Sequence, residues 1–301
     1  INRVIGIGKV VSTKIPSHNP QNICIWLQQK IKQYLEPEGN HQLPSIVPWY
    51  KGFYGSIVMH KDKYVTYGSF YVQGKDVIIT GLPVGKTVVS YLADTVKKMM
   101  DEEIISDYDD KGDTTTPRLI LKNYKGNPSH QELKLITRDS YSNMTVIYPN
   151  FDETVNHMAK FTIKYYKTVT ELMEEFFSLR RIIYHSRKSK QLEKMYEELK
   201  YLRSKRRFVQ LVNDNELIIS NRVEAELEEE MVKLDLPTVL LDNIKSRSFN
   251  LQGIKRIDKD IDDLMRNIEE LKQTVPEVIW FTEIEDFIKQ YCSHNKEPRK
   301  S

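Results

Sequence analysis

One stretch of the sequence has the residue types that bind a nucleotide phosphate. Residues 81–87 have the sequence GLPVGKT, follow a run typical of a strand and precede a predicted helix. A phosphate-binding loop needs four residues between its glycines and backbone N–H groups that point at the phosphate. Here only three residues separate Gly81 from Gly85, and Pro83 has no N–H. We therefore expect an ordinary turn from strand to helix, with a nucleotide-binding enzyme as the alternative.

No other pattern predicts catalysis or metal binding. The seven histidines lack metal-ligand spacing, and the two cysteines, Cys24 and Cys292, are far apart without other ligands nearby. The acidic run at residues 107–113 lacks the glutamate that an EF-hand requires, so we expect a solvated loop there. Two isolated cysteines favour a reducing, intracellular compartment. The sequence predicts no metal site and no cofactor bound by this chain.

Positive charge is concentrated at the N-terminal end. The net charge of the 301-residue chain is only +3, but residues 1–100 contain 12 Lys and Arg against 5 Asp and Glu. Such an excess favours contacts with phosphates, although a solvated basic face is the alternative. No apolar run approaches the roughly 20 residues of a membrane helix, so no membrane partner is expected. Because the first residue is Ile1 and no signal peptide is visible, we interpret the chain as part of a longer protein.

Residues 21–165 are predicted to form a mixed α/β domain. Short runs of β-branched and aromatic residues alternate with turns. One helix is expected at residues 19–35, with Asn19 as N-cap and Pro20 at the first helical position, and another at about 88–103. The strands are expected at 55–59, 64–72, 77–80, 118–123, 133–136 and 160–164, with a turn and a strand within 137–150.

The later residues have the pattern of a coiled coil. Apolar residues recur at alternating spacings of 4 and 3 in a first stripe of Leu172, Phe176, Leu179, Ile183, Leu192, Met195, Leu199 and Leu202, interrupted at residues 185–190. A second stripe, which ends at Pro276, consists of Ile254, Ile257, Ile261, Leu264, Ile268, Leu271 and Val275. We predict an antiparallel pair with arms at 166–207 and 254–294 (the second including a closing helix), a tip at 208–253 and a tail at 295–301.

Several blocks of sequence, in this order, resemble type IIA DNA topoisomerases of the eukaryotic and large-DNA-virus kind. Residues 6–20, GIGKVVSTKIPSHNP, are similar to the family's GIGTGWST-x-IP-x-x-NP segment, and residues 48–55, PWYKGFYG, to its PWYKGF-x-G block. Residues 79–84, ITGLPV, resemble its ITELP turn, and residues 274–287 resemble its KTPKDLW-x-x-DLDEF ending. RRFV at 206–209 is close to the KARFI at the tip of its first coiled-coil arm.

The departures from the family pattern are specific. Lys9, Val10 and Val11 replace the family's T-G-W, and Gly81 replaces its Glu. These departures favour an enzyme of a large cytoplasmic DNA virus, acting at the cytoplasmic replication site, over a nuclear cellular enzyme. The fold implied is α+β: a tower-like mixed α/β domain, then a long antiparallel coiled coil with a small helical globular tip, the C-gate.

The resemblance implies DNA contacts at the N-terminal end. In the family, the isoleucine of the GIG segment inserts between base pairs and bends the duplex, and this role falls on Ile7 within a wedge segment at residues 1–20. Unstacking costs a few kcal/mol, and added phosphate contacts on the bent duplex offset it. The predicted DNA-binding residues are Ile7, Lys9, Ser12, Lys14 and Lys51. An ordinary buried strand residue is the alternative for Ile7.

The resemblance also implies a homodimeric, ATP-dependent isomerase that passes one DNA duplex through a double-strand break in another. The family's catalytic tyrosine lies upstream, so no catalytic residue is predicted here and this chain alone is expected to be inactive. Mg²⁺ and ATP are expected to be needed by the parent enzyme. The tip would form the exit gate between two copies, and its candidate residues, which could equally form the tip's own core, are Leu240, Leu241, Phe249 and Leu251.

The long arms alone would also fit a non-enzymatic coiled-coil scaffold or DNA-organising protein. Such a protein has no reason to carry a PWYKGF block ahead of the coil. The ordered set of motifs therefore favours the topoisomerase.

Overall fold

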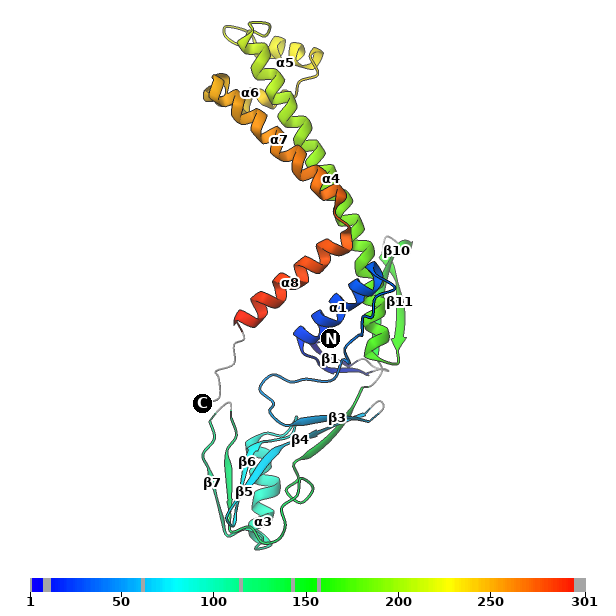
Figure 1. The fold of residues 1–301 in the computed structure, drawn as a ribbon, viewed down its shortest axis with the longest axis vertical. Helices are drawn as coiled ribbons and strands as arrows, with labels where there is room; N and C mark the ends of the chain where they lie inside the picture. Colours follow the sequence, from blue (N-terminus) through cyan, green and yellow to red (C-terminus); the bar gives the residue numbers. More distant parts are fainter. Residues whose placement is uncertain are drawn as a thin grey trace. The chain divides into compact units, whose positions relative to one another are not determined.

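The structure, a computed structural model, describes residues 2–7, 12–60, 63–113, 116–141, 144–155 and 158–294. It has two compact units, residues 1–177 with 291–301 and residues 178–290. The described strands all belong to the first unit and the second unit is helical (Figure 1). The long helix α4 (Val169–Asn213) begins in the first unit and continues in the second. The predicted mixture of strands and long helices is confirmed, and the described strand pairs are antiparallel.

The first unit opens with a hairpin and a helix. Strands β1 (Asn2–Ile7) and β2 (Ser12–Ser17) pair antiparallel, and helix α1 (Pro20–Leu35) follows. The side chain of Asn19 caps this helix by accepting a hydrogen bond of 2.9 Å from the Gln21 N–H. Trp26 and Ile31 are buried on one face of the helix. The predicted helix, with its N-cap and its first-turn proline, is confirmed.

Two antiparallel sheets form the body of the first unit. The three-stranded sheet has the order β3 (Ser56–His60), β4 (Lys63–Tyr67), β9 (Ile136–Ser140). The four-stranded sheet has the order β5 (Ser69–Gln73), β6 (Asp76–Gly81), β8 (Leu119–Lys122), β7 (Asp107–Asp110). A helix covers this second sheet (Figure 1) in three consecutive parts: α2 (Val88–Tyr91), the π-helical turn η1 (Leu92–Val96) and α3 (Lys97–Asp101). Their shared core consists of Val77, Ile79, Leu82, Tyr91, Val96, Met99, Ile105, Leu119, Leu121, Leu133 and Leu135.

Gly68 divides one predicted strand into two. The run expected at 64–72 is β4 in one sheet and β5 in the other. The Gly68 N–H donates to the Leu135 carbonyl at 2.9 Å, and a Cβ at Gly68 would lie only 2.4 Å from the Gly81 carbonyl oxygen. Only glycine fits where the chain passes from one sheet to the other.

Three further predictions of local structure are corrected. The acidic run expected as a solvated loop forms the edge strand β7 at Asp107–Asp110, because Lys122 on β8 pairs with both Asp107 and Asp109 at 3.0 Å. The strand expected at 133–136 begins only at Ile136, although Leu133 is fully buried in the preceding turn. The strand expected at 160–164 belongs to a longer hairpin of β10 (Met144–Val155) and β11 (Met158–Tyr166).

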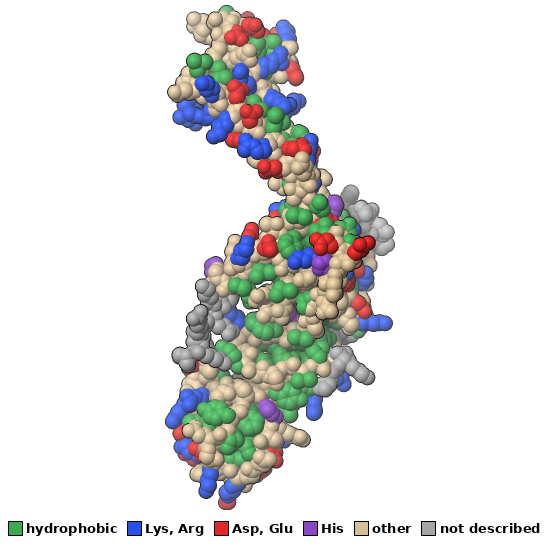
Figure 2. Space-filling view, viewed as in Figure 1, with side chains coloured by type: hydrophobic (Ala, Val, Ile, Leu, Met, Phe, Trp, Pro, Cys, Tyr) green, Lys and Arg blue, Asp and Glu red, His purple; other side chains and the backbone are tan. Residues whose placement is uncertain are grey.

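In the second unit, α4 and α7 (Leu251–Gln273) run antiparallel. Arg206 pairs with Asp258 at 2.7 Å, and the Lys272 ammonium lies 5.3 Å from the centre of the Tyr196 ring. Later residues of α7 therefore face earlier residues of α4, as in an antiparallel pair. Leu199, Ile257 and Ile268, all from the predicted stripes, are buried. Figure 2 shows side chains of both charges over the outer faces of this pair.

In the first part of the predicted stripe, the burial predicted for Phe176, Leu179 and Ile183 is wrong. Phe176, Leu179 and Ile183 are 44, 40 and 51% exposed, and the neighbouring positions Met173, Phe177 and Tyr184 are buried instead. Opposite the predicted break at 185–190, α7 ends: Lys188 Nζ donates to the Lys272 and Thr274 carbonyls, each at 2.8 Å.

Helix α8 (Pro276–His294) then replaces α7 as the partner of α4. The Trp280 ring stacks on Tyr184 with centroids 5.3 Å apart, and Arg187 pairs with Glu283 at 2.8 Å. The closing helix was expected only from Trp280, so α8 starts one turn earlier than predicted, at Pro276, where proline suits the first position of a helix.

The tip between α4 and α7 has its own core. Its elements are α5 (Glu224–Lys233), α6 (Leu240–Asn243) and the 3-10 turn η2 (Ser246–Phe249). The buried residues are Phe208, Val209, Leu217, Leu227, Met231, Leu236, Leu240 and Ile257. Among the described residues, no helix has both the length and the apolar composition that crossing a membrane requires.

Candidate nucleic-acid interface

Ile7 is at the end of β1. In the antiparallel register Ile7 pairs with Ser12 and Gly6 with Thr13, so Ile7 is the last described residue of β1. Residues 8–11 lie outside the described residues, and with them the predicted contact Lys9. The side chains of Ile7 and Ser12 also lie outside the description, so only their backbone positions are known.

Gly6, the neighbour of Ile7 in β1, is exposed. Among the described residues, a Cβ built on Gly6 would meet nothing closer than the Thr13 Cβ at 4.0 Å, so packing against them does not require glycine at this position. A glycine on an open strand does allow another backbone or a ligand to approach closely.

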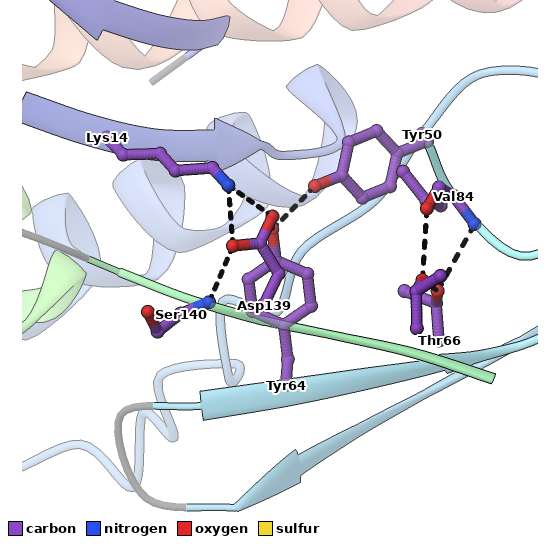
Figure 3. Close-up of polar contacts among 8 residues, drawn as sticks. Lys14, Tyr50, Tyr64, Thr66, Val84, Asp139 and Ser140 are labelled. Atoms are coloured by element: carbon purple, nitrogen blue, oxygen red, sulfur yellow. Dashed lines mark hydrogen bonds and ion pairs between the residues drawn. The ribbon is translucent and has the colours of Figure 1, made fainter. Parts of the chain in front are cut away.

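Lys14, the described cation of the hairpin among the predicted contacts, is held by the sheet domain (Figure 3). Its Nζ lies 2.5 Å from both carboxylate oxygens of Asp139 on β9. The Tyr64 hydroxyl on β4 donates to the same carboxylate at 3.1 Å, which leaves its oxygen to accept a hydrogen bond of 2.8 Å from the Tyr50 hydroxyl. The chain of contacts thus runs from the hairpin through the three-stranded sheet to the PWYKGFYG block.

The protonation of this network is set by burial and by Lys14. Partial burial favours a higher pKa for the Asp139 carboxyl, but the hydrogen bonds from Lys14, the Ser140 N–H and Tyr64 outweigh it and hold the pKa below its usual range. Burial raises the pKa of Tyr64, and contact with Tyr50 and Asp139 adds to the effect. At neutral pH Asp139 is therefore a carboxylate and Tyr64 a neutral phenol, and the carboxylate compensates the positive charge of Lys14 within the chain.

The PWYKGFYG block attaches directly to the end of β2. His18 forms a β-bridge with Pro48, and the Trp49 N–H donates to the Ser17 carbonyl at 2.7 Å. His18 is almost completely buried, and its Nε2 lies 3.0 Å from the Tyr141 hydroxyl. These contacts fix the direction in which the hairpin leaves the sheet domain.

Within the block, Lys51 and the glycines have separate positions. Lys51 is exposed at a turn, followed by Gly52 with a φ of 78° that favours glycine. A Cβ at Gly55 would lie 1.9 Å from the Tyr67 carbonyl oxygen, so only glycine allows the block to join β3 here. Lys51 therefore lies on the surface of the same unit as the hairpin, as a phosphate contact requires.

Comparison with known proteins decides the family. The family model for the A subunit of DNA gyrase/topoisomerase IV matches residues 1–287. This chain belongs to that family. A DNA topoisomerase 2 of Bombyx mori is 29% identical over 274 residues, which cover 86% of this chain and 16% of the relative. A DNA topoisomerase 2 of Invertebrate iridescent virus 6 is 26% identical over 294 residues, covering 94% of this chain and 24% of the relative.

A solved structure shares the fold. The DNA-binding, cleavage and re-ligation domain of Plasmodium falciparum topoisomerase II matches 99% of this chain with a TM-score of 0.77 and 22% identity, and 45% of that chain is covered. The chain spans less than a quarter of the Bombyx mori and viral relatives. The matched relatives give no support to the non-enzymatic scaffold alternative.

In this member of the gyrase/topoisomerase IV family, the GLPVGKT segment is a structural turn. The Thr66 hydroxyl accepts from the Val84 N–H at 3.2 Å, and the Thr137 hydroxyl donates to the Val84 carbonyl at 3.0 Å (Figure 3). Lys86 Nζ donates to the Lys134 carbonyl at 2.7 Å, and Thr87 caps α2. The donors that a phosphate would need are used within the chain, which argues against the nucleotide-binding alternative.

Within the described residues, no group of three or more His, Cys, Asp and Glu side chains is placed to hold a metal ion.

The candidate gate residues fall into three classes. Leu240 is completely buried in the tip core, so in this chain it is a core residue and not a surface contact, which was the alternative left open by the sequence. Leu241 and Phe249 are half-buried against that core, and the Phe249 ring centre lies 6.3 Å from that of Phe208. Leu251 is 79% exposed at the start of α7. Leu251 alone of the four is available for contact with another molecule.

Sequence reasoning missed Asp139 and Tyr64. Asp139 is 125 residues from Lys14, and no spacing rule connects an aspartate in a strand with a lysine so distant. Tyr64 is in a predicted strand, but which face of the strand it occupies depends on the sheet partner. Tyr50 was within a motif that the sequence did single out.

Proposed function

We propose that this chain is the DNA-bending and exit-gate part of a type IIA DNA topoisomerase, an isomerase that passes one duplex through a transient break in another. Family membership over residues 1–287 and the relatives named DNA topoisomerase 2 support this proposal. The parent enzyme would use ATP and Mg²⁺ bound elsewhere. The viral relative is in line with a role in viral DNA replication in the cytoplasm, and a nuclear enzyme is the alternative.

The observation that carries the proposal is the position of Ile7. It is the last described residue of β1, beside the exposed Gly6, on a hairpin anchored to the sheet domain by Lys14 and His18. An apolar wedge acts only if its support is rigid, because a flexible hairpin would yield before the base step opened. Ile7 would enter the base step, while the cations of residues 1–100 contact phosphates on the bent duplex.

The remaining DNA contacts follow from this orientation. Ser12 pairs with Ile7 across the hairpin, and Lys9 follows Ile7 in the chain, so both would lie near the phosphates that flank the opened step. Lys14 would share its ammonium between Asp139 and a phosphate, since its side chain is still 39% exposed. Lys51 would contact the duplex from the exposed turn of the PWYKGFYG block.

The two other parts of the chain would serve the gate. Residues 21–165 correspond to the tower that supports the bent DNA, and the antiparallel α4–α7 pair with its tip corresponds to the coiled-coil exit gate. A symmetric contact between two tips would make the protein a homodimer. The tip has an exposed apolar residue, Leu251, for such a contact. Phe249 lies two residues before it in the sequence, and both Leu241 and Phe249 are only partly buried against the tip core.

The test is the bending of a short duplex labelled at both ends for energy transfer. Ile7→Ala is expected to lower the energy transfer of the bound duplex while thermal unfolding is unchanged. The matched control is Ile163→Ala, which removes the same atoms from an exposed isoleucine on the β10–β11 hairpin and should leave bending intact. Unaltered energy transfer with Ile7→Ala would remove the wedge from the proposal.

A further inference from the structure

The tip carries a cluster of cations that line one hollow. Lys205 comes from α4, Lys245 and Arg247 from the start of η2, and Arg256 from α7. The hollow has a volume of about 230 Å³, and Asp260 is the one carboxylate among its described lining residues. In Figure 2, Lys and Arg side chains gather over the tip near the start of α7.

The charge in this hollow is largely uncompensated. Lys205, Lys245, Arg247 and Arg256 make no ion pair within 4.0 Å to a described carboxylate. Other arginines of the tip are paired, since Arg206 binds Asp258 at 2.7 Å and Arg222 binds Glu230. Cations brought together without partners repel one another, and a bound multivalent anion relieves that repulsion.

Close packing fixes the elements that present these cations. A Cβ at Gly253 would lie 2.5 Å from the Arg247 carbonyl oxygen and 2.6 Å from the Ser248 Cα, so η2 rests directly on the first turn of α7. The Asn250 side chain accepts from the Gly253 N–H at 2.7 Å and caps the helix. The backbones that carry Arg247 and Arg256 are therefore held together before any ligand binds.

The lining indicates which anion fits. Arginine provides forked N–H donors and lysine a compact charge, the combination used for phosphate. The volume is several times the roughly 30 Å³ of one water molecule, which is enough for a phosphate group with some of its water. No aromatic side chain is among the described lining residues, so nothing there would stack on a nucleotide base.

We propose that this hollow is a phosphate-binding site, and that its ligand is a backbone phosphodiester of duplex DNA. Phosphate binding by the tip is independent of the function proposed above, whereas the choice of a duplex as the source of the phosphate rests on it. A duplex that leaves between two tips would pass these cations. The site would give the departing duplex a backbone contact at the gate that does not depend on base sequence.

The test uses the full chain and hydrogen–deuterium exchange at residues 245–260, with pyrophosphate or a short duplex as the added ligand. Both ligands are expected to slow exchange there. The double variant Arg247→Gln/Arg256→Gln should lower the affinity for either ligand, measured from this protection, roughly tenfold. This magnitude assumes that each exposed cation contributes about threefold to the affinity. The log–log slope of duplex binding against salt should become shallower by about 1 for each phosphate that the variant no longer neutralises.

Two further variants distinguish a defined phosphate site from non-specific attraction of anions by the positive charge of the tip. Lys233→Gln removes one exposed cation from α5, outside the hollow, and should leave the protection of 245–260 intact. Asp260→Asn removes the lining carboxylate and should raise the affinity, a change that a misfolded variant would not produce. Equal losses for Lys233→Gln and for the arginine variants would overturn the site.

Comparing the two ligands shows whether the bound phosphate belongs to a duplex, and the Ile7→Ala variant shows whether binding at the tip depends on the wedge. Protection by pyrophosphate without protection by the duplex would overturn the duplex assignment, and protection by neither would overturn the site. If Ile7→Ala abolishes bending while duplex protection of residues 245–260 persists, tip binding is shown to be independent of the wedge. Loss of that protection in Ile7→Ala would overturn direct binding of the duplex by the tip.

Discussion

The Lys14–Asp139 pair should be an energetic connection between the DNA hairpin and the sheet domain. We expect Asp139→Asn to destabilise the first unit by about 1 kcal/mol, because the charge is removed while an amide oxygen still accepts from the Ser140 N–H. Asp139→Ala should cost about 2 kcal/mol, because it also removes the hydrogen bonds from Ser140 and Tyr64 at 2.8 and 3.1 Å.

The coupling between the two residues follows from their exposure. The side chains are 39 and 36% exposed, so water screens the pair and the several kcal/mol of a buried ion pair do not apply. Both carboxylate oxygens lie 2.5 Å from the ammonium, which places the pair at the upper end of the exposed range. We expect a coupling energy of about 0.5–1 kcal/mol between Lys14→Gln and Asp139→Asn.

The assay is denaturant unfolding followed by tryptophan fluorescence. Trp26 and Trp49 are in the first unit and Trp280 is in the second, so a Trp280→Phe background makes the signal specific to the first unit. The four proteins of the double-mutant cycle are compared in that background, with Asp107→Asn on the edge strand β7 as a control carboxylate. Additive effects of the two substitutions would refute the pair as a connection between hairpin and sheet.

Two further predictions concern pH and assembly. Because the pKa of Asp139 is lower in the folded chain than in the unfolded chain, its stabilisation is present above the ordinary carboxyl pKa near 4 and is lost as the pH falls through the lowered value. Unfolding at several acidic pH values should therefore show a steeper loss of stability for the parent than for Asp139→Asn, and parallel curves would contradict this. Leu251→Asp should shift a dimeric chain toward monomer in sedimentation velocity, whereas Leu251→Met should not; an unchanged profile for the aspartate variant would move the interface elsewhere.

Elements whose signals are local were predictable from the sequence. Asn19 and Pro20 mark the start of α1 because capping and a fixed φ act within one turn. The α7 stripe predicts its buried face because the helix repeat is regular and one partner covers its length. In the same way, three residues between the glycines and the presence of Pro83 were enough to disfavour a phosphate loop at 81–87.

Features that depend on distant partners were not predictable. The run at 107–113 contains four aspartates, which favour a loop by composition, yet Lys122 on the neighbouring strand compensates two of them and the strand forms. The role of Asp139 at the candidate site was unpredictable for the same reason, since Asp139 contacts Lys14 only because the sheet brings the two residues together. For both, the decisive partner is set by sheet pairing, which the sequence pattern did not specify.

The break in the α4 stripe was located correctly from the sequence, but the periodic pattern did not show that the partner helix changes there. A heptad stripe predicts which face is buried only while one partner remains in register. Here α4 packs against α8 in the residues that precede Lys188 and against α7 in the residues that follow it. In the part that packs against α8, Tyr184 is buried and Ile183 is exposed. The polar residues at 185–190 are therefore the point at which the partner changes: Lys188 binds the last carbonyls of α7, and Arg187 pairs with α8. A polar interruption between two apolar stripes that differ in phase is better interpreted as a change of partner than as a gap in one coiled coil.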